Sequence, residues 1–395
     1  MDTQATLLEK IDPFQVIFII HLAGLLIQPM LELVVPLYHP FQNAMLMKII
    51  FVAWGSYLFG KYLMKLVVYW NKEIPVKNCS EVNIKILFIL IILQFLLVMS
   101  RYFLKGIPIL SASPDIAKGF FLTHPTYGCT RILYIGLPLS IFIFLAYQLK
   151  NKERLFSFLN ICILGMGLLP LFIGLFKGAV ITFILGGVLV YDKFLKRIRL
   201  KISFYNILLA MLIIFIPILQ YYYSEGEKDF GHSAAYVFQR LTVYSLEGFN
   251  YIVYAKLPPT WENQLKICLG LEVDHFGNPG ILLSQEMLNK EKPNFATVTT
   301  LYGFCWRNGG WATLIIVFTI LGIIIENLIR RIRFSCNTFF VPFYFFIIII
   351  FLKMVLVGEP FNDLRGPILT LLLAIWIFEF TKIKGGLDTN ENPVS

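Results

Sequence analysis

Four basic residues, Arg101, Lys118, Lys177 and Arg240, lie in or beside the connections between long apolar segments, where a cation could bind an anionic group. Arg101 ends the third apolar segment, and Lys118 follows it beyond two prolines that exclude a continuous helix. Lys177 stands in a very short connection, and Arg240 belongs to an amphipathic pattern. In a low-dielectric setting such cations stabilise developing negative charge, as on a departing phosphate, without a metal. The alternative for Arg101 and Lys118 is that they only extend into solvent.

A cluster of potential bases lies further along the chain, at Glu272, Asp274 and His275. A histidine beside carboxylates suits general-base work on a hydroxyl group, with His275 as the base and the carboxylates as helpers. His232 and Glu247, which flank the fourth cation, are rivals for this role. No HExxH or CxxC spacing accompanies these residues, so no metal is expected.

Two further arginines are possible substrate contacts. Arg307 precedes the eighth apolar segment, and Arg365 lies in a short turn near the C-terminus. For Arg365 an ion pair with a neighbouring carboxylate is the favoured explanation.

These residues must be positioned by a chain of unusual composition. Of its 395 residues, 57% are hydrophobic and 15% charged, and the mean hydropathy is +0.73, which predicts an integral membrane protein. The net charge of +10 follows from basic loops, so nucleic acid is not expected as a partner.

No nucleotide-binding glycine motif occurs, and no cofactor is expected. Six cysteines form no framework; whether Cys268 pairs with Cys305 is left open by the sequence.

Apolar runs long enough to cross the membrane occur at about ten places, each roughly 17 to 25 residues long. They begin near Pro13, Ala44, Ile84, Ile132, Phe156, Gly178, Phe204, Trp311, Phe339 and Pro367. The predicted organisation is helices one to seven in residues 1–223, a long loop in 224–310, and helices eight to ten with a tail in 311–395. The fold class is therefore an all-α polytopic membrane protein.

Basic residues between the spans predict the orientation. About 17 of them lie on one side and about 6 in the short loops of the other, and positive loops stay cytoplasmic. Both termini are predicted to be cytoplasmic, with the first helix as a signal anchor. The long loop, with its amphipathic helix, and the four cations then face outward.

The pattern resembles the Wzy-type O-antigen polymerases, also called oligosaccharide repeat unit polymerases. The resemblance rests on the topology, the Ile-Pro-Ile-Leu-Ser segment leading to Lys118, the Phe-Lys177-Gly connection, Arg240 near the start of the long loop, and residues 297–310 before the next span. It covers most of the chain but is loose. Where the family often has arginine, this chain has Lys118 and Lys177, which keep the charge but lose the bidentate fork.

The resemblance implies a GT-C-like, metal-independent glycosyltransferase at the periplasmic face of the bacterial inner membrane. Its substrates would be undecaprenyl-pyrophosphate-linked oligosaccharides held in the lipid, and a chain-length regulator protein is a possible partner. Arg240 and Lys177 would bind the donor pyrophosphate, with Lys118 and Arg101 as further phosphate or acceptor contacts.

Three alternatives remain beside this hypothesis. An O-antigen ligase shares the fold and the donor, but its usual His-Asn pair before a Gly-Gly segment does not match the arrangement after His275. A lipid-linked oligosaccharide flippase should show internal repeats, and none is found. A purely structural subunit gives no reason for cations gathered with prolines at one surface.

Overall fold

The structure, a computed structural model, describes only part of the chain. The described residues are 12–31, 42–70, 82–111, 117, 132–151, 157–195, 245–255, 257–260, 262, 279–288, 300–335, 337–357, 372 and 375–377. Within these ranges the protein is helical and contains no β-strand.

The main helices follow the predicted apolar segments. They are α2 (Pro13–Leu31), α3 (Asn43–Trp70), α4 (Ile84–Lys105), α7 (Leu137–Lys150), α8 (Phe158–Ile173), α9 (Lys177–Leu195), α15 (Leu301–Phe334) and α16 (Phe340–Val357). A π-helical turn, η2 (Ile132–Gly136), precedes α7, and a short 3-10 turn, η1 (Pro108–Leu110), follows α4. Two shorter helices, α12 (Ser245–Ala255) and α14 (Pro279–Leu288), come from the predicted long loop.

Four helical segments are long and apolar enough to cross a membrane, namely 43–67, 84–110, 132–150 and 301–334, and shorter apolar helices occupy 13–29, 158–173 and 340–356. The prediction of an all-helical fold is confirmed for the described residues, and the length and composition of these segments agree with the predicted membrane protein. The predicted spans near Phe204 and Pro367 fall largely outside the described residues, so the count of ten stays a prediction.

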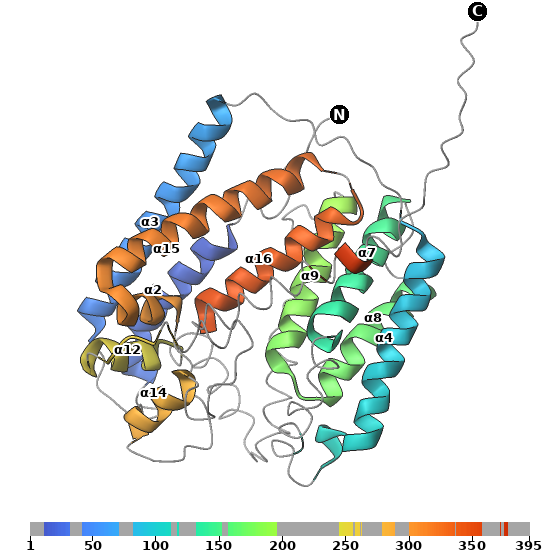
Figure 1. The fold of residues 1–395 in the computed structure, drawn as a ribbon, viewed down its shortest axis with the longest axis horizontal. Coiled ribbons are helices and arrows are strands. Elements are labelled where there is room, and N and C mark those ends of the chain that lie inside the picture. The colour runs from blue at the N-terminus through green and yellow to red at the C-terminus, as the bar shows by residue number, and fades with distance from the viewer. Residues whose placement is uncertain are drawn as a thin grey trace, which may run out of the picture.

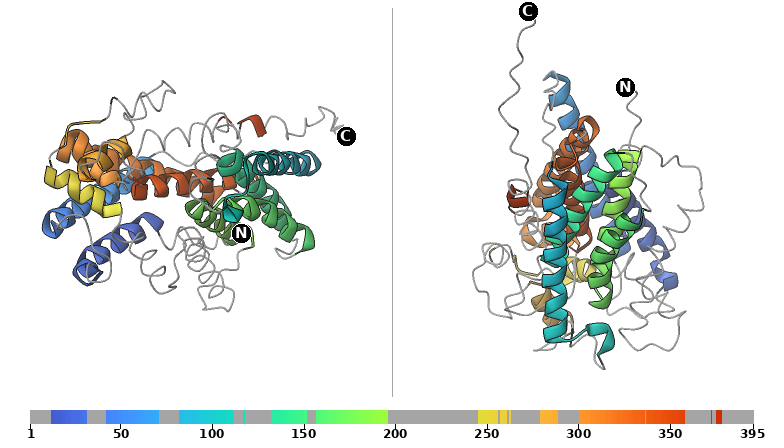
Figure 2. Two further views of the ribbon diagram at one scale, coloured as in Figure 1. Left: turned by 90° about the horizontal axis from the view of Figure 1, so that it is seen from below. Right: turned by 90° about the vertical axis from the view of Figure 1, so that its right-hand side faces the viewer.

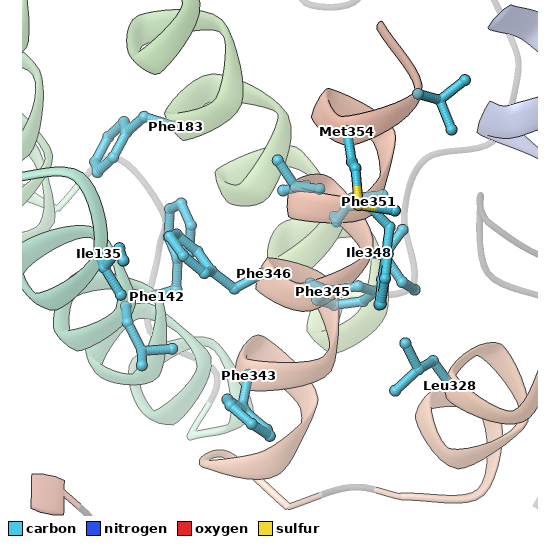
Figure 3. Packing of buried hydrophobic residues seen from close by; sticks show 14 of the residues in the cluster. Ile135, Phe142, Phe183, Leu328, Phe343, Phe345, Phe346, Ile348, Phe351 and Met354 are labelled. Carbon is cyan, nitrogen blue, oxygen red and sulfur yellow. The ribbon is translucent and has the colours of Figure 1, made fainter. Parts of the chain in front are cut away.

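The helices form two groups joined by α16. One group contains α2, α3 and α15, the other contains α4, α7, α8 and α9, and α16 contacts members of both (Figure 1). Seen from below, α16 runs between the groups (Figure 2). Aromatic side chains fill one of these contacts: the ring centroid of Phe142 on α7 lies 6.3 Å from that of Phe346 on α16 and 5.2 Å from that of Phe183 on α9 (Figure 3).

Helices α3 and α15 pack closely because glycines lie at their crossing. A Cβ atom at Gly60 would clash with the backbone oxygen of Thr319, and one at Gly322 would clash with the backbone oxygen of Tyr57. Small residues let helix backbones approach in membranes, where dispersion and polar contacts drive association. This seam is the main contact of its group.

Charged residues lie at one end of the same seam. Lys61 Nζ lies 2.6 Å from Asp12 Oδ2 and 3.4 Å from Glu326 Oε2, and the Tyr57 hydroxyl donates to Asp12 at 2.9 Å. Asp12 Oδ1 also accepts from the Phe14 amide at 2.9 Å, which caps the start of α2. The cluster therefore connects α2, α3 and α15.

The opposite end carries the elements of the long loop. Helices α12 and α14 lie there, together with the C-terminal end of α4 and the first turn of α9 (Figure 1). We call this the loop end. Helix α12 is tied to the start of α3, because Asn250 Oδ1 accepts from the Gln42 amide at 2.9 Å.

Helix α15 begins ten residues before the predicted start of its span at Trp311. Thr300 caps it by accepting from the Gly303 amide. The helix is interrupted at Gly309 and Gly310, and Gly310 adopts φ 59° and ψ −137°, a conformation that favours glycine. The residues before this break belong with the loop elements, and the apolar span continues after it.

Candidate functional site

Three segments meet at the loop end of α4. The Tyr102 hydroxyl donates to the Pro170 backbone oxygen at 2.7 Å, and Gly174 in the turn between α8 and α9 has no side chain to displace that hydroxyl. The rings of Tyr134 in η2 and Phe176 stand edge to face, with centroids 5.1 Å apart. These contacts fix the end of α4 against the start of the η2–α7 helix and the α8–α9 turn.

Arg101 immediately precedes Tyr102 on α4. Its Nε and Nη2 atoms are buried and have no hydrogen-bond partner among the residues that the structure describes. A guanidinium group is always charged and offers five N–H donors in a fixed fork, and a buried donor without a partner is costly. Arg101 is thus a cation with donors available to an anion, whereas Lys105 one turn later is exposed to solvent.

Lys177 is the first residue of α9 and directly follows Phe176. The turn before it is sharp, because Leu175 adopts a positive φ of 57° and the Phe176 amide donates to the Leu171 oxygen at 3.0 Å. Arg101 therefore directly precedes the tyrosine that contacts α8 and the α8–α9 turn, and Lys177 directly follows that turn. The first turn of α9 adds the positive end of its helix dipole. The Lys177 side chain itself lies outside the described part.

Glu247 lies elsewhere. It is buried in α12, whose Phe249 ring packs 5.9 Å from the ring of Tyr302 on α15. This places Glu247 with the α2, α3 and α15 group, while Arg101 belongs to the other group (Figure 1). The structure does not bring these two predicted site residues together.

Arg307 is committed to contacts within the loop end. Its Nε donates to the Pro258 oxygen at 2.6 Å, and its Nη2 lies 3.6 Å from Glu286 Oε1 on α14. Beside it, Asn308 Oδ1 accepts from the Thr260 amide at 2.7 Å. Arg307 is 91% buried by side chains and backbone around it, so its guanidinium joins α14 and residues 257–260 to α15.

Burial disfavours the charged form of Glu286, the partner of Arg307. Burial raises the pKa of the Glu286 carboxyl above its usual value, and the positive charge of Arg307 only partly opposes this shift. Glu286 Oε2 has no hydrogen-bond partner among the described residues. The Tyr251 hydroxyl donates to the Glu286 backbone oxygen at 2.9 Å and holds α14 against α12.

Several predicted residues lie outside the described ranges. They are Lys118, His232, Arg240, Glu272, Asp274, His275 and Arg365. In the described part, no group of three or more His, Cys, Asp or Glu residues could hold a metal ion. Cys305 is a buried free thiol in the structure.

Sequence reasoning missed the aromatic residues that join the three segments at the end of α4, namely Tyr102, Tyr134 and Phe176. Their position at the ends of apolar segments is a signal, because tyrosines gather at membrane interfaces. It also missed Gln94, a buried polar residue two helical turns before Arg101.

No family model, curated protein or solved structure matches this chain.

Proposed function

We propose that this protein is a GT-C-like glycosyltransferase that polymerises undecaprenyl-pyrophosphate-linked oligosaccharide units into O-antigen or a related surface polysaccharide. Its loop end would face the periplasm, with about ten spans and both termini in the cytoplasm. One observation carries the proposal: Arg101 has buried guanidinium nitrogens without a hydrogen-bond partner among the described residues, at the end of α4 that contacts α8 and the turn before Lys177.

The proposed reaction joins two lipid-linked glycans. A hydroxyl oxygen of the acceptor sugar forms a bond to the anomeric carbon of the donor, and the bond from that carbon to the pyrophosphate oxygen breaks. The bonding electrons leave with undecaprenyl pyrophosphate, and the hydroxyl proton passes to a base. His275, assisted by Asp274 or Glu272, remains our proposal for that base.

Arg101 would bind the departing pyrophosphate together with Lys177, Arg240 and Lys118. A guanidinium fork binds phosphate oxygens through two parallel N–H bonds and holds its charge at any working pH. The donors are already buried, so little reorganisation is needed as charge develops on the leaving group. By analogy with removal of one oxyanion donor, loss of Arg101 should cost about 3 kcal/mol in the barrier.

The decisive test is a transfer assay in proteoliposomes with an undecaprenyl-pyrophosphate-linked oligosaccharide as both donor and acceptor. We expect the parent protein to form a ladder of products and Arg101→Ala to lower the rate by about 10²-fold or more. Arg101→Lys should recover part of the rate, because it restores the charge but not the fork. Lys105→Ala is the matched control, an exposed cation on the same helix that should retain the parent rate. An Arg101→Ala variant as active as the parent would remove the pyrophosphate role.

The native host separates the alternatives. Deletion of the gene should leave lipopolysaccharide core bearing a single repeat unit, and restoration should return the ladder of chain lengths. Bare core after deletion would indicate a ligase or a flippase instead. An unchanged ladder would contradict any role in lipopolysaccharide assembly.

A further inference from the structure

The seam between α4 and α7 contains buried polar atoms that have no hydrogen-bond partner among the described residues. Besides Arg101 Nε and Nη2, Gln94 Oε1 on α4 and Ser140 Oγ on α7 are buried and find no hydrogen-bond partner in the described ranges. Gln94 is 7% exposed and Ser140 is fully buried. Three orphaned groups on two adjoining helices are unusual in a folded protein, where buried polar atoms are nearly always hydrogen-bonded.

The three residues face the same seam. Gln94 and Arg101 are seven residues apart, which places them on one side of α4, two turns from each other. Gly136 lies against Gln94, since a Cβ atom at this glycine would be 3.3 Å from Gln94 Nε2. The absence of a side chain at position 136 thus lets the amide of Gln94 approach the start of α7.

Ser140 follows Gly136 by one turn on the same side of α7. One turn further, the ring of Phe144 lies 6.2 Å from the ring of Phe88 on α4. Ser140 stands between two positions that both contact α4, so its hydroxyl also faces α4. From the loop end inward, the seam therefore presents Arg101, then Gln94, then Ser140, and the pair of phenylalanine rings closes it.

These groups are complementary to water. Arg101 supplies N–H donors, Gln94 Oε1 accepts, and the Ser140 hydroxyl does both. Water molecules satisfy buried polar groups that protein cannot reach, provided that each water has two or more polar partners. An apolar ligand would leave all three groups unsatisfied, and a lone anion at Arg101 would leave Gln94 and Ser140 without partners.

We propose that the α4–α7 seam binds a short file of ordered water that extends from Arg101 past Gln94 to Ser140. The role of this file rests on the proposed function. The water oriented by Gln94 and Ser140 hydrates the pyrophosphate at Arg101 from the side away from the loop end, and it stabilises the negative charge of the pyrophosphate within the membrane. Gln94 and Ser140 are then positioning residues, which act on the anion through water.

Cysteine accessibility tests the water file without any substrate. In a background with the 6 native cysteines replaced, Gln94→Cys and Ser140→Cys are treated with a small water-soluble methanethiosulfonate cation. Only an ionised thiol reacts, and ionisation requires water. One control is Leu93→Cys, next to Gln94 in the chain, whose native side chain is 58% exposed on the outer surface of the helix bundle. The other is Ala53→Cys, at a fully buried position in α3.

We expect both seam cysteines to react at least about tenfold faster than both controls. Rates at positions 94 and 140 equal to that of the buried control would overturn the proposal. Inorganic pyrophosphate should then slow labelling of Ser140→Cys when Arg101 is present. Fast labelling without this protection would support the water file and contradict the anion at Arg101, so the two proposals fail separately.

Thermal unfolding of Gln94→Leu and Ser140→Ala in detergent gives a second test. If the seam is dry, each substitution removes a buried polar group that has no hydrogen-bond partner. The Tm of each variant should then rise, because the desolvation penalty of that group disappears while the packing changes little. If the seam holds water, the Tm should stay the same or fall. A rise in both variants would overturn the proposal.

Discussion

The charged cluster of Asp12, Lys61 and Glu326 predicts a large, specific loss of stability when its cation is removed. Lys61→Met keeps most of the apolar part of the side chain but leaves two carboxylates without their common partner. The Asp12 and Glu326 side chains are only 8% and 16% exposed, so water compensates them poorly. Breaking a buried pair in this way costs about 3–5 kcal/mol, most of it from the uncompensated charge.

The geometry predicts how this cost divides between the two carboxylates. Asp12 lies closer to Lys61, at 2.6 Å against 3.4 Å for Glu326, and is the less exposed. In Lys61→Met, a second change of Asp12→Asn should therefore recover more stability than Glu326→Gln. We expect about 2 kcal/mol of recovery for Asp12→Asn, which is the magnitude of a hydrogen bond to a buried charged group. For Glu326→Gln we expect about 1 kcal/mol, because this carboxylate is more exposed and lies farther from Lys61.

The assay is thermal unfolding of the purified protein in detergent, followed by the fluorescence of its tryptophans. A loss of 3–5 kcal/mol should lower the Tm by on the order of 5–10 °C. Lys48→Met, an exposed lysine on the same helix, is the control and should leave the Tm unchanged. If Lys61→Met were as stable as the parent, or if the two rescues ranked in the opposite order, the reasoning from burial and distance would be refuted.

Two further predictions concern packing and pH. Gly60→Ala should destabilise the protein by about 1–3 kcal/mol, because the new Cβ atom meets the α15 backbone. The control is Gly55→Ala on the open side of α3, which should be neutral or stabilising. Equal Tm values for the two variants would contradict the close contact between α3 and α15. Because burial raises the folded-state pKa of Glu286 above its unfolded value, this carboxyl favours folding while protonated and loses that contribution as pH rises through the folded pKa. The stability of the parent relative to Glu286→Gln should therefore fall as the pH rises from below the ordinary pKa range of a glutamate toward neutrality, as measured by Tm. A parent that gained stability relative to Glu286→Gln as the pH rose would contradict this prediction.

The sequence predicted the helices better than their contacts. Apolar runs determine where helices form, and those starting at Pro13, Asn43, Ile84, Ile132, Phe158, Lys177 and Phe340 each begin within two residues of a predicted span. The start of α15 was missed because a polar cap at Thr300 and a glycine break decide it, while hydropathy registers only the apolar part after the break.

The candidate site could be predicted only in part, for a similar reason. The position of Arg101 and Lys177 at helix ends follows from the sequence. The contact of the α4 end with α8 does not, because it depends on Tyr102 donating to the backbone oxygen of Pro170, which is distant along the chain. For Arg307 the sequence showed a cation at the end of the predicted long outer loop, but its partner Glu286 and the Pro258 oxygen are distant along the chain.

The partners of each buried cationic group distinguish the structural cations from the candidate functional one. Lys61 is neutralised by Asp12 and Glu326, and Arg307 donates to a backbone oxygen and lies near Glu286. In the described ranges, Arg101 differs from both, since two of its buried nitrogens have no protein acceptor. A protein that stabilised itself with Arg101 would place a carboxylate or carbonyl there, as it does for the other two cations. The unsatisfied donors therefore favour a ligand that brings its own negative charge, and substitution of Arg101 should reduce anion binding far more than it reduces stability.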